Sequence, residues 1–451
     1  MKIVIAGDGE VGFHLAKTLL MEEHDIVIVD PHKDLLQMLE SNMDLLTITG
    51  DSTNPAVLLE AGADKADLLI SVVHDQDINL LTATIGKQLG AKRTIARVSN
   101  PAYLSKRWKE MFSRMGVDEI VSPEIIVADD IIALLKRSAA IETYQFGDGL
   151  LLLYMIKLEK DASVVNKTLK EVAKEYPDLD FRVVAIYRDG KSFIPKGDDV
   201  FLPNDLTYVI TKEEGIPQLL AMGAKTQIDI KDIMIVGGGR IGKRTAQQLE
   251  KQARIKLIEK DKERCQVLAD ELNNTLIING DARDVDLLRS EGIENTDAFI
   301  AVTDSTEINI MISLHAGKLG AKKTIALVDN IDYIDLAHSV GIDTIITKKL
   351  VTASYITRFT HGQEVTMLKC LSGIDAEIIE LIAQEGSPVT KKPIKDLKLP
   401  KGSFVGGIVR GKQAFIATGD TQILPGDKVV IFAFPDAIAK VEKMFKRSSW
   451  F

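Results

Sequence analysis

Cysteine is scarce in this sequence, and long apolar runs are missing. Only two cysteines, Cys265 and Cys370, occur among 451 residues. Two thiols alone build neither a disulfide framework nor a closed metal cage. No uninterrupted apolar stretch reaches the length of about 18 residues that spans a bilayer. The chain starts with a strand pattern instead of a signal peptide, so we expect a cytoplasmic protein.

An excess of positive charge is also missing. The formal net charge is −9, so no basic field draws nucleic-acid phosphates, and we expect no nucleic-acid partner. Hydrophobic residues make up 45% and charged residues 27%, as in ordinary globular proteins. The length exceeds what one hydrophobic core supports and predicts about three to four domains.

Two internal repeats, in the order A-B-A-B, organise the chain. A shift of 230 residues places IMIVGGGRIG (233–242) on IVIAGDGEVG (3–12), and LGAKKTIA (319–326) on LGAKRTIA (89–96). The first A copy carries five extra residues around SKRWKEMFSRM, which we expect to lengthen a surface helix or its loop. A shift of 222 residues aligns the B copies over 185–210 and 407–432.

Each A unit alternates short β-branched runs with amphipathic helical stretches. This alternation predicts right-handed βαβ units, a parallel sheet and a doubly wound Rossmann-type α/β domain. Each B unit is shorter and is predicted to be a small α+β lobe. The expected domains are 1–140, 141–225, 226–361 and 362–451, with the stretch from TKEEGIPQ to KTQIDIK (211–231) as the linker between the two halves.

A G-x-G-x-x-G loop opens both A units. The first glycine allows a tight turn, the second lets a pyrophosphate approach the backbone, and the third lets helix and strand pack closely. Because a strand precedes each loop and a helix follows it, both loops are predicted to hold nucleotide phosphates at a helix N-terminus. The alternative is a retained fold in which the glycines serve packing only. The candidate binding residues are Gly7, Asp8, Gly9, Glu10, Val11 and Gly12, and then Gly237, Gly238, Gly239, Arg240, Ile241 and Gly242.

An acidic residue ends the second expected strand of each A unit, Asp30 in the first and Glu259 in the second. A carboxylate there accepts the ribose hydroxyls and repels a 2′-phosphate, which favours NAD(H) or an adenine nucleotide over NADP(H). The loops themselves differ, with Glu10 in one and Arg240 in the other. Since a guanidinium can fork onto phosphates, we expect the second site to tolerate ATP or ADP. In the alternative, the side chain at position 10 points to solvent and has no effect on nucleotide preference.

Further candidates follow the other strands, because ligands bind at the carboxyl ends of parallel strands. A guanidinium at position 97 can reach a phosphate or form a surface ion pair, and Leu327 replaces it in the second copy. The candidates are Asp51, Ser52, Val73, His74, Arg97 and Val98 in the first copy, and Asp281, Ala282, Thr303 and Asp304 in the second.

The repeat order and three stretches of sequence resemble the TrkA family, the peripheral subunits of microbial Trk potassium-uptake systems. The stretches are GDGEVG…VD, GDST…LLEAGADKAD and GDARDVDLLRSEGIENTDAFIAVT. In family terms, A is the N-lobe and B the C-lobe of a domain regulating potassium conductance (RCK). The resemblance implies a cytosolic ring, tetrameric by analogy, assembled under the membrane potassium channel or transporter TrkH at the inner face of the cell membrane. It also implies that nucleotide binding reshapes the ring and gates the pore.

The resemblance bears on metals as well. In related lobes, a glutamate after the sixth strand helps to hold a cation near the nucleotide phosphates. VSPE places Glu124 at that position, whereas ITKK places Lys348 there in the second copy. Apart from Glu124, we expect no metal ligand.

A dehydrogenase is the alternative to a sensor. Hydride transfer needs a proton-handling group beside the cofactor. The seven histidines do not recur at equivalent repeat positions, Asp304 replaces His74, and no Y-x-x-x-K pattern occurs in either cleft region. We therefore expect a nucleotide-binding regulator and not an enzyme. An NAD-dependent oxidoreductase with a duplicated cofactor domain remains the second reading.

Two apolar helical stretches, 125–140 and 350–360, follow the A units. Each is a candidate for a crossover or interface helix. The alternative is that each belongs to the core of its own A unit, which is common for such apolar stripes.

Overall fold

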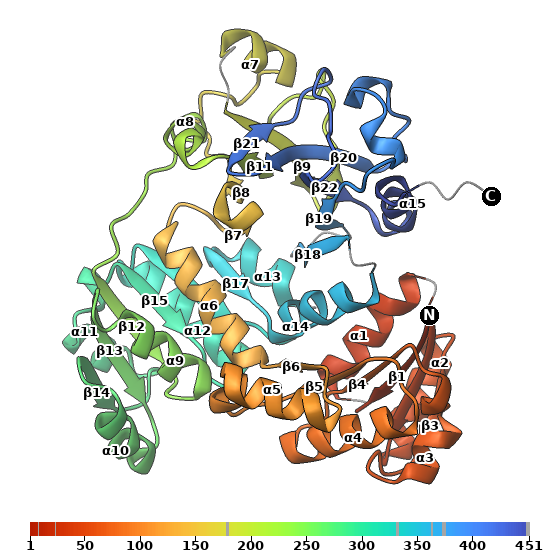
Figure 1. Cartoon of the computed structure of the whole chain (residues 1–451). Coiled ribbons are helices and arrows are strands. Elements are labelled where there is room, and N and C mark those ends of the chain that lie inside the picture. The colour runs from red at the N-terminus through yellow and green to blue at the C-terminus, as the bar shows by residue number, and fades with distance from the viewer. Residues whose placement is uncertain are drawn as a thin grey trace. The chain divides into compact units, whose positions relative to one another are not determined.

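The computed structural model describes the chain apart from residues 8, 23, 177–179, 331–332, 362–363, 372–375 and 448–451. It contains two six-stranded and two five-stranded sheets among the described residues (Figure 1). They occur alternately along the chain, as the A-B-A-B repeat predicts.

The first N-lobe is a doubly wound parallel sheet with the strand order β3-β2-β1-β4-β5-β6. Its central strands β1 and β4 carry continuous apolar runs because helices cover both faces of such a sheet. The strands are β1 (Lys2–Ala6), β2 (Asp25–Asp30), β3 (Leu46–Thr49), β4 (Leu68–Ser71), β5 (Thr94–Arg97) and β6 (Glu119–Val121). The helices are α1 (Glu10–Met21), α2 (Lys33–Asn42), α3 (Pro55–Glu60), α4 (Gln76–Leu89), α5 (Lys106–Met115) and α6 (Pro123–Lys136).

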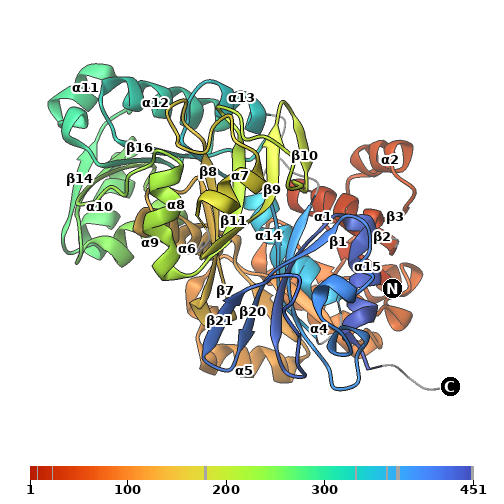
Figure 2. The same cartoon turned by 90° about the horizontal axis from the view of Figure 1, so that it is seen from above.

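The second N-lobe repeats this order as β14-β13-β12-β15-β16-β17. Figure 2 shows α9 and α10 on one face of its sheet and α11 and α12 on the other. The strands are β12 (Asp232–Val236), β13 (Arg254–Glu259), β14 (Thr275–Asn279), β15 (Ala298–Ala301), β16 (Lys323–Leu327) and β17 (Thr344–Ile346). The helices are α9 (Arg240–Leu249), α10 (Lys262–Glu271), α11 (Val285–Ser290), α12 (Thr306–Leu319), α13 (Ile334–Ser339) and α14 (Lys348–Thr357). The predicted Rossmann-type fold is confirmed in both copies, and the extra residues of the first copy do lengthen a helix, since α5 is longer than α13.

The C-lobes are five-stranded sheets with the orders β10-β9-β11-β8-β7 and β18-β19-β22-β20-β21. Buried residues of both sheets, among them Phe146, Leu151, Val430 and Phe432, form one shared core. The first lobe contains β7 (Glu142–Phe146), β8 (Leu151–Lys157), α7 (Leu169–Glu175), β9 (Phe181–Arg188), β10 (Lys191–Phe193), β11 (Leu206–Thr211) and α8 (Ile216–Met222). The second contains β18 (Val365–Cys370), β19 (Glu377–Ile382), β20 (Ser403–Arg410), β21 (Gln413–Ile416), β22 (Lys428–Ala433) and α15 (Pro435–Phe445).

The predicted linker was too long. Helix α8 lies within it, and Leu219, Leu220 and Met222 of that helix are buried in the core of the first C-lobe. Their apolar spacing outweighs the acidic and glycine-containing sequence before them, so only the stretch after α8 connects the two halves.

Helix α14 leaves its own half of the chain. The chain forms two compact units, and 348–363 belongs to the unit built on Met1–Ile126. Ala353, Ile356 and Phe359 pack into the core of the first N-lobe, and α14 lies beside α1 (Figures 1 and 2). The crossover reading is therefore confirmed for this stretch, and the reading as the core of its own unit is wrong.

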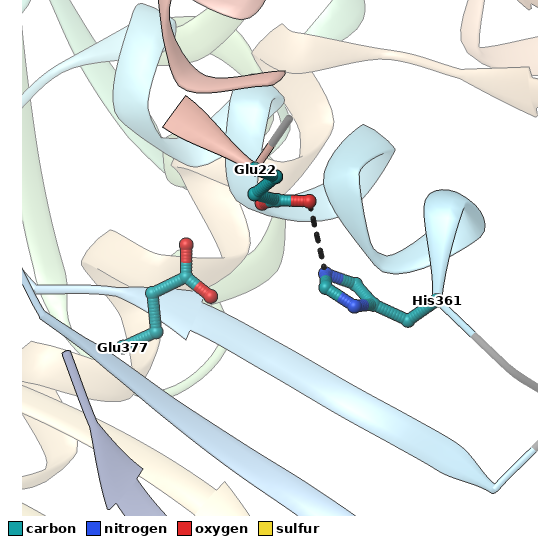
Figure 3. A group of neighbouring side chains, drawn as sticks. All are labelled: Glu22, His361 and Glu377. Carbon is teal, nitrogen blue, oxygen red and sulfur yellow. Dashed lines mark ion pairs between the residues drawn. The ribbon is translucent and has the colours of Figure 1, made fainter. Parts of the chain in front are cut away.

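A buried ion pair connects the end of the α14 segment to helix α1. His361 Nε2 lies 3.6 Å from Glu22 Oε2 at the C-terminus of α1, and both side chains are only 7% exposed (Figure 3). Thr360 Oγ1 donates to the same carboxylate at 3.4 Å. Within the described part of the chain, no helix is both long enough and apolar enough to cross a bilayer.

Candidate nucleotide-binding sites

The first and third glycines of each loop are required by the fold. Gly7 and Gly237 have φ angles of +113° and +102°, which favour glycine. A Cβ on Gly12 would lie 2.0 Å from the carbonyl oxygen of Gly7, and a Cβ on Gly242 would lie 2.0 Å from that of Gly237. These four glycines are explained by turn geometry and by helix–strand packing.

The second glycine of each loop has no such explanation. A Cβ added to Gly9 or Gly239 would meet no atom within 4 Å. Each of these glycines is the N-cap of a helix, α1 or α9, and neither provides a side-chain capping bond. The space in front of both helix N-termini is therefore open, and the first backbone amides of each helix face it.

The residues between the loop glycines differ in exposure and in whether the structure describes them. Asp8 lies outside the described residues, and so does the side chain of Glu10. Val11 packs against the core of the first N-lobe and Ile241 is 5% exposed, so only their backbone amides can reach a ligand. Arg240 is exposed as the first residue of α9.

The two predicted ribose carboxylates end β2 and β13. Asp30 is buried and accepts hydrogen bonds from the backbone N and the Nδ1 of His32, at 2.9 and 2.7 Å. Glu259 accepts hydrogen bonds from the backbone N–H groups of Gly238, at 2.8 Å, and Asp261, at 2.9 Å. The second carboxylate is thus tied directly to the glycine loop.

A cavity of about 440 Å³ lies over the second loop. It contains most of the residues that the sequence predicts for this site, namely Gly237, Gly239, Glu259, Asp281, Ala282, Thr303 and Asp304. Sequence reasoning missed three cations that line the same cavity, Lys260, Arg264 and Arg283. Lys260 directly follows β13, Arg264 lies in the first turn of α10, and Arg283 lies in the loop after β14. Their positions shortly after two strand ends were a usable signal.

The aspartates after the third strands differ in electrostatic setting. Hydrogen bonds from the backbone and side chain of Thr53, both at 2.8 Å, lower the pKa of Asp51. Asp281 instead accepts from Arg283, with an Nη2–Oδ2 distance of 2.5 Å, and lies 3.4 Å from Lys260 Nζ. The Arg283 guanidinium, aided by its backbone N–H, holds the pKa of Asp281 far below its usual range. The second site therefore carries more cationic groups beside its aspartate.

Two predicted side chains point away from the first site. Ser52 is 4% exposed and its Oγ lies 3.0 Å from the Oγ1 of Thr82 in α4. Val98 is fully buried with Ala83, Ala96 and Phe112. Their positions after strands were read correctly, but the side chains alternate and these two face the core. Val73 is partly buried, while His74 is exposed.

Two buried asparagines at equivalent repeat positions shape the site loops, a role that sequence reasoning missed. Asn79 accepts from the backbone N–H of Val73 at 2.8 Å and donates to the carbonyl oxygens of Val73 and Arg97. Asn309 makes the same bonds to Thr303 and Leu327 in the second copy. They fix the ends of the fourth and fifth strands. An asparagine near the start of a helix at equivalent repeat positions was the available signal.

Arg97 and Glu124 lie together, with an Nη2–Oε1 distance of 3.3 Å. Both come from the carboxyl edge of the first sheet, at the end of β5 and the start of α6. An ion pair here places a fixed positive charge beside the one carboxylate considered for a cation. The equivalent residue after β17 is Lys348, which offers no carboxylate.

These features define a class of protein: two Rossmann N-lobes, each with an open glycine loop and a terminal carboxylate, and each followed by an antiparallel α+β lobe. The TrkA-N domain model matches residues 3–123 and 233–348, and the TrkA-C domain model matches 153–222 and 378–446. The chain belongs to the TrkA family.

Full-length relatives agree with this assignment, and a solved structure shares the fold. The chain is 33% identical to the Trk system potassium uptake protein TrkA of Azorhizobium caulinodans, over 99% of each chain. It is 36% identical to the Trk system potassium uptake protein TrkA homolog 1 of Methanosarcina mazei, over 99% of this chain and all of that protein. The GsuK channel bound to NAD shares the fold, with a TM-score of 0.60 at 18% identity, over 98% of this chain and 78% of that one.

Proposed function

We propose that this protein is a nucleotide-sensing regulatory subunit of a membrane potassium-transport system. Its N-lobes bind NAD(H), and the second N-lobe also takes ATP or ADP. Binding changes the arrangement of the lobes and so gates a TrkH-like membrane partner. A ligand can shift such an equilibrium only by its different affinity for the two arrangements.

One observation carries the proposal: Gly9 and Gly239 are glycines where the fold would accept a Cβ. A packing role explains the other loop glycines but not these two. A pyrophosphate that approaches the helix N-terminus requires this open space. The names of the relatives support the potassium-transport context, and the NAD-bound GsuK channel supports the choice of nucleotide.

The remaining parts of the proposal follow from family membership. We assign the nucleotide-binding N-lobes to 1–140 and 226–361 and the C-lobes to 141–225 and 362–451. Four chains form a ring of eight N-lobes at the inner face of the cell membrane. The protein acts through binding and not through catalysis.

Calorimetric titration of the full chain with NADH, NAD, ATP and ADP tests the proposal. Gly9→Ala and Gly239→Ala each remove binding at one site while the thermal midpoint stays unchanged, and Asp30→Ala and Glu259→Ala weaken binding at the same sites. Gly317→Ala is the matched control in the second N-lobe, because its Cβ would meet only Thr324 Cγ2 at 3.6 Å. This control leaves binding as it is.

Two outcomes overturn the proposal. Steady oxidation of NADH with a candidate substrate makes the chain a dehydrogenase. Absence of binding by all four nucleotides makes both loops structural remnants. Light scattering measures the number of chains in the ring, and rubidium uptake into vesicles that contain the membrane partner measures gating by nucleotide.

A further inference from the structure

A cavity of about 690 Å³ is lined by no residue of either glycine loop. We call it the hinge cavity, because its walls come from the two connecting segments 138–141 and 224–228, from the strand ends of the first C-lobe, and from 322–323 and 339–343 of the second N-lobe. All of these residues belong to one compact unit. The connecting segments are also joined to each other, since Ser138 Oγ donates to the carbonyl of Ile228 at 2.8 Å and accepts from its N–H at 2.7 Å.

Positive charge exceeds negative charge in the lining. The cations are Lys157, Arg188, Lys225, Lys322 and Lys323, and the carboxylates are Glu159, Asp189, Asp205 and Asp343. Most of the carboxylates are already engaged. Asp205 accepts two bonds of 2.7 Å from Arg188, Asp343 Oδ2 accepts two of 2.8 Å from the backbone and side chain of Thr324, and Glu159 pairs with Lys225.

Lys323 is the unusual member of this lining. It is 3% exposed, and its Nζ donates to the carbonyl oxygens of Ser138 at 2.7 Å and Ala140 at 2.6 Å. An ammonium group has three N–H donors, so one remains, and within the described chain no carboxylate lies within 4 Å of it. Burial lowers the pKa of Lys323 to about 8, so the group still carries its charge at pH 7. Lys157 likewise has no carboxylate partner within that part of the chain.

Apolar side chains also line the cavity. Ala139, Ala140, Ile141, Leu206, Ile228 and Ile342 contribute to the walls. A concave site of about 300–1,000 Å³ with apolar walls and a few convergent polar groups is typical of small-molecule sites. Burial of an ammonium group is costly, and an entering anion relieves that cost.

We propose that the hinge cavity is a binding site for a small organic anion, a carboxylate or phosphate ester with an apolar body, whose charged group is held by Lys323 and Lys157. The site is separate from the nucleotide sites and does not depend on the function proposed for them. Because its walls include both connecting segments, an occupied cavity stabilises one arrangement of the first C-lobe and the second N-lobe.

Calorimetry with three matched probes tests this site on the full chain. 1-Naphthyl phosphate and 1-naphthoate present the two kinds of anion on one apolar body, and 1-naphthol is the uncharged control. We expect at least one anion to bind once per chain and 1-naphthol to bind about tenfold more weakly or not at all. The stronger of the two anions identifies the chemical class of the natural ligand.

Lysine variants test whether the probe binds in the hinge cavity. Lys323→Met and Lys157→Met are each expected to weaken anion binding about tenfold, and two variants guard against a folding defect in one of them. Lys170→Met removes a lysine that is 68% exposed in the same C-lobe and leaves binding unchanged. Failure of both anions to bind at millimolar concentration, equal binding of 1-naphthol, or binding insensitive to both lysine variants would overturn the site.

Competition separates this proposal from the nucleotide proposal. Saturating ADP leaves anion binding unchanged if the probe occupies the hinge cavity. Displacement by ADP places the probe in a glycine loop and overturns the inference. If none of the four nucleotides binds, the nucleotide proposal fails, and the lysine variants still test the hinge cavity.

Discussion

Asp427 accepts two parallel hydrogen bonds from Arg410, with Nε–Oδ1 and Nη2–Oδ2 distances of 2.8 Å. Its side chain is 1% exposed, and it also accepts the backbone N–H of Leu424 at 2.7 Å. Arg188 and Asp205 form the same pair in the first C-lobe, with both distances 2.7 Å. The weak B repeat in the sequence therefore corresponds to an Arg–Asp pair in each C-lobe. The pair joins the end of one strand to the turn before the last strand.

Replacement of Asp427 by alanine should strongly destabilise the second C-lobe. The change leaves the N–H of Leu424 without its acceptor and Arg410 without its counter-ion. We expect the free energy of unfolding to fall by about 2–3 kcal/mol, measured by urea denaturation. The matched control is Asp420→Ala, whose carboxylate pairs with Lys395 but is 82% exposed. It should change stability by less than about 1 kcal/mol, and equal losses for the two variants would contradict the prediction.

The third glycine of the second loop should be intolerant of a side chain. In Gly242→Ala the new Cβ would meet the carbonyl oxygen of Gly237 at 2.0 Å, so helix α9 must shift away from β12. We expect a loss of about 2–3 kcal/mol in the free energy of unfolding. Gly239→Ala, in the same loop but with open space around it, should unfold at the wild-type midpoint. A wild-type midpoint for Gly242→Ala as well would show that the helix adjusts freely.

His14 should make the first N-lobe sensitive to acid. Burial lowers the pKa of His14 to about 4, with Lys17 and Lys349 acting in the same direction. Between pH 6.5 and pH 4 the unfolded chain binds a proton that the folded chain does not, so stability falls as the pH falls through this window. The loss amounts to about 3 kcal/mol at most. Urea midpoints of wild type and His14→Phe, measured from pH 7 to pH 4, should diverge, and parallel curves would sink the prediction.

Lys323 should give a dependence of the same sign at alkaline pH. Its folded pKa of about 8 lies below the ordinary value of 10.5. From pH 8 to pH 10.5 the unfolded chain therefore binds more protons, and the stability of the wild type rises with pH. The rise relative to Lys323→Met should reach about 3 kcal/mol at most. Denaturation of both proteins at pH 7.5, 9 and 10 measures it, and a constant difference between them would mean that the ammonium is not buried in solution.

Sequence patterns predicted the strands and the glycine loops well because local physics governs them. A buried parallel strand needs a continuous apolar run, and a turn such as that at Gly7 needs a residue that tolerates positive φ. The terminal carboxylates Asp30 and Glu259 were found for a similar reason, since chain order alone puts them at the end of the second strand. Each of these features depends on neighbours within a few residues.

Other features depended on contacts between distant segments. Ser52 and Val98 follow their strands as expected, yet their side chains face the core. Helix α8 was mistaken for a linker because its burial is decided by the sheet of the first C-lobe and not by its flanking charges. The local sequence does not distinguish a helix that packs on its own lobe from one that packs on another lobe. Helix α14 follows the second N-lobe in sequence but packs on the first.

The sequence by itself determined the duplicated architecture, the place of each glycine loop and the acidic residue beside it. Repeats can be read directly from the sequence, and turn geometry depends on residues that are adjacent in the chain. Only the tertiary structure decided which glycines the fold demands and which leave open space. It also gathered Lys157 and Lys323 from different lobes around one cavity and bound His361 to Glu22. Those relationships join residues far apart in the chain, and such contacts form only when packing has placed the elements.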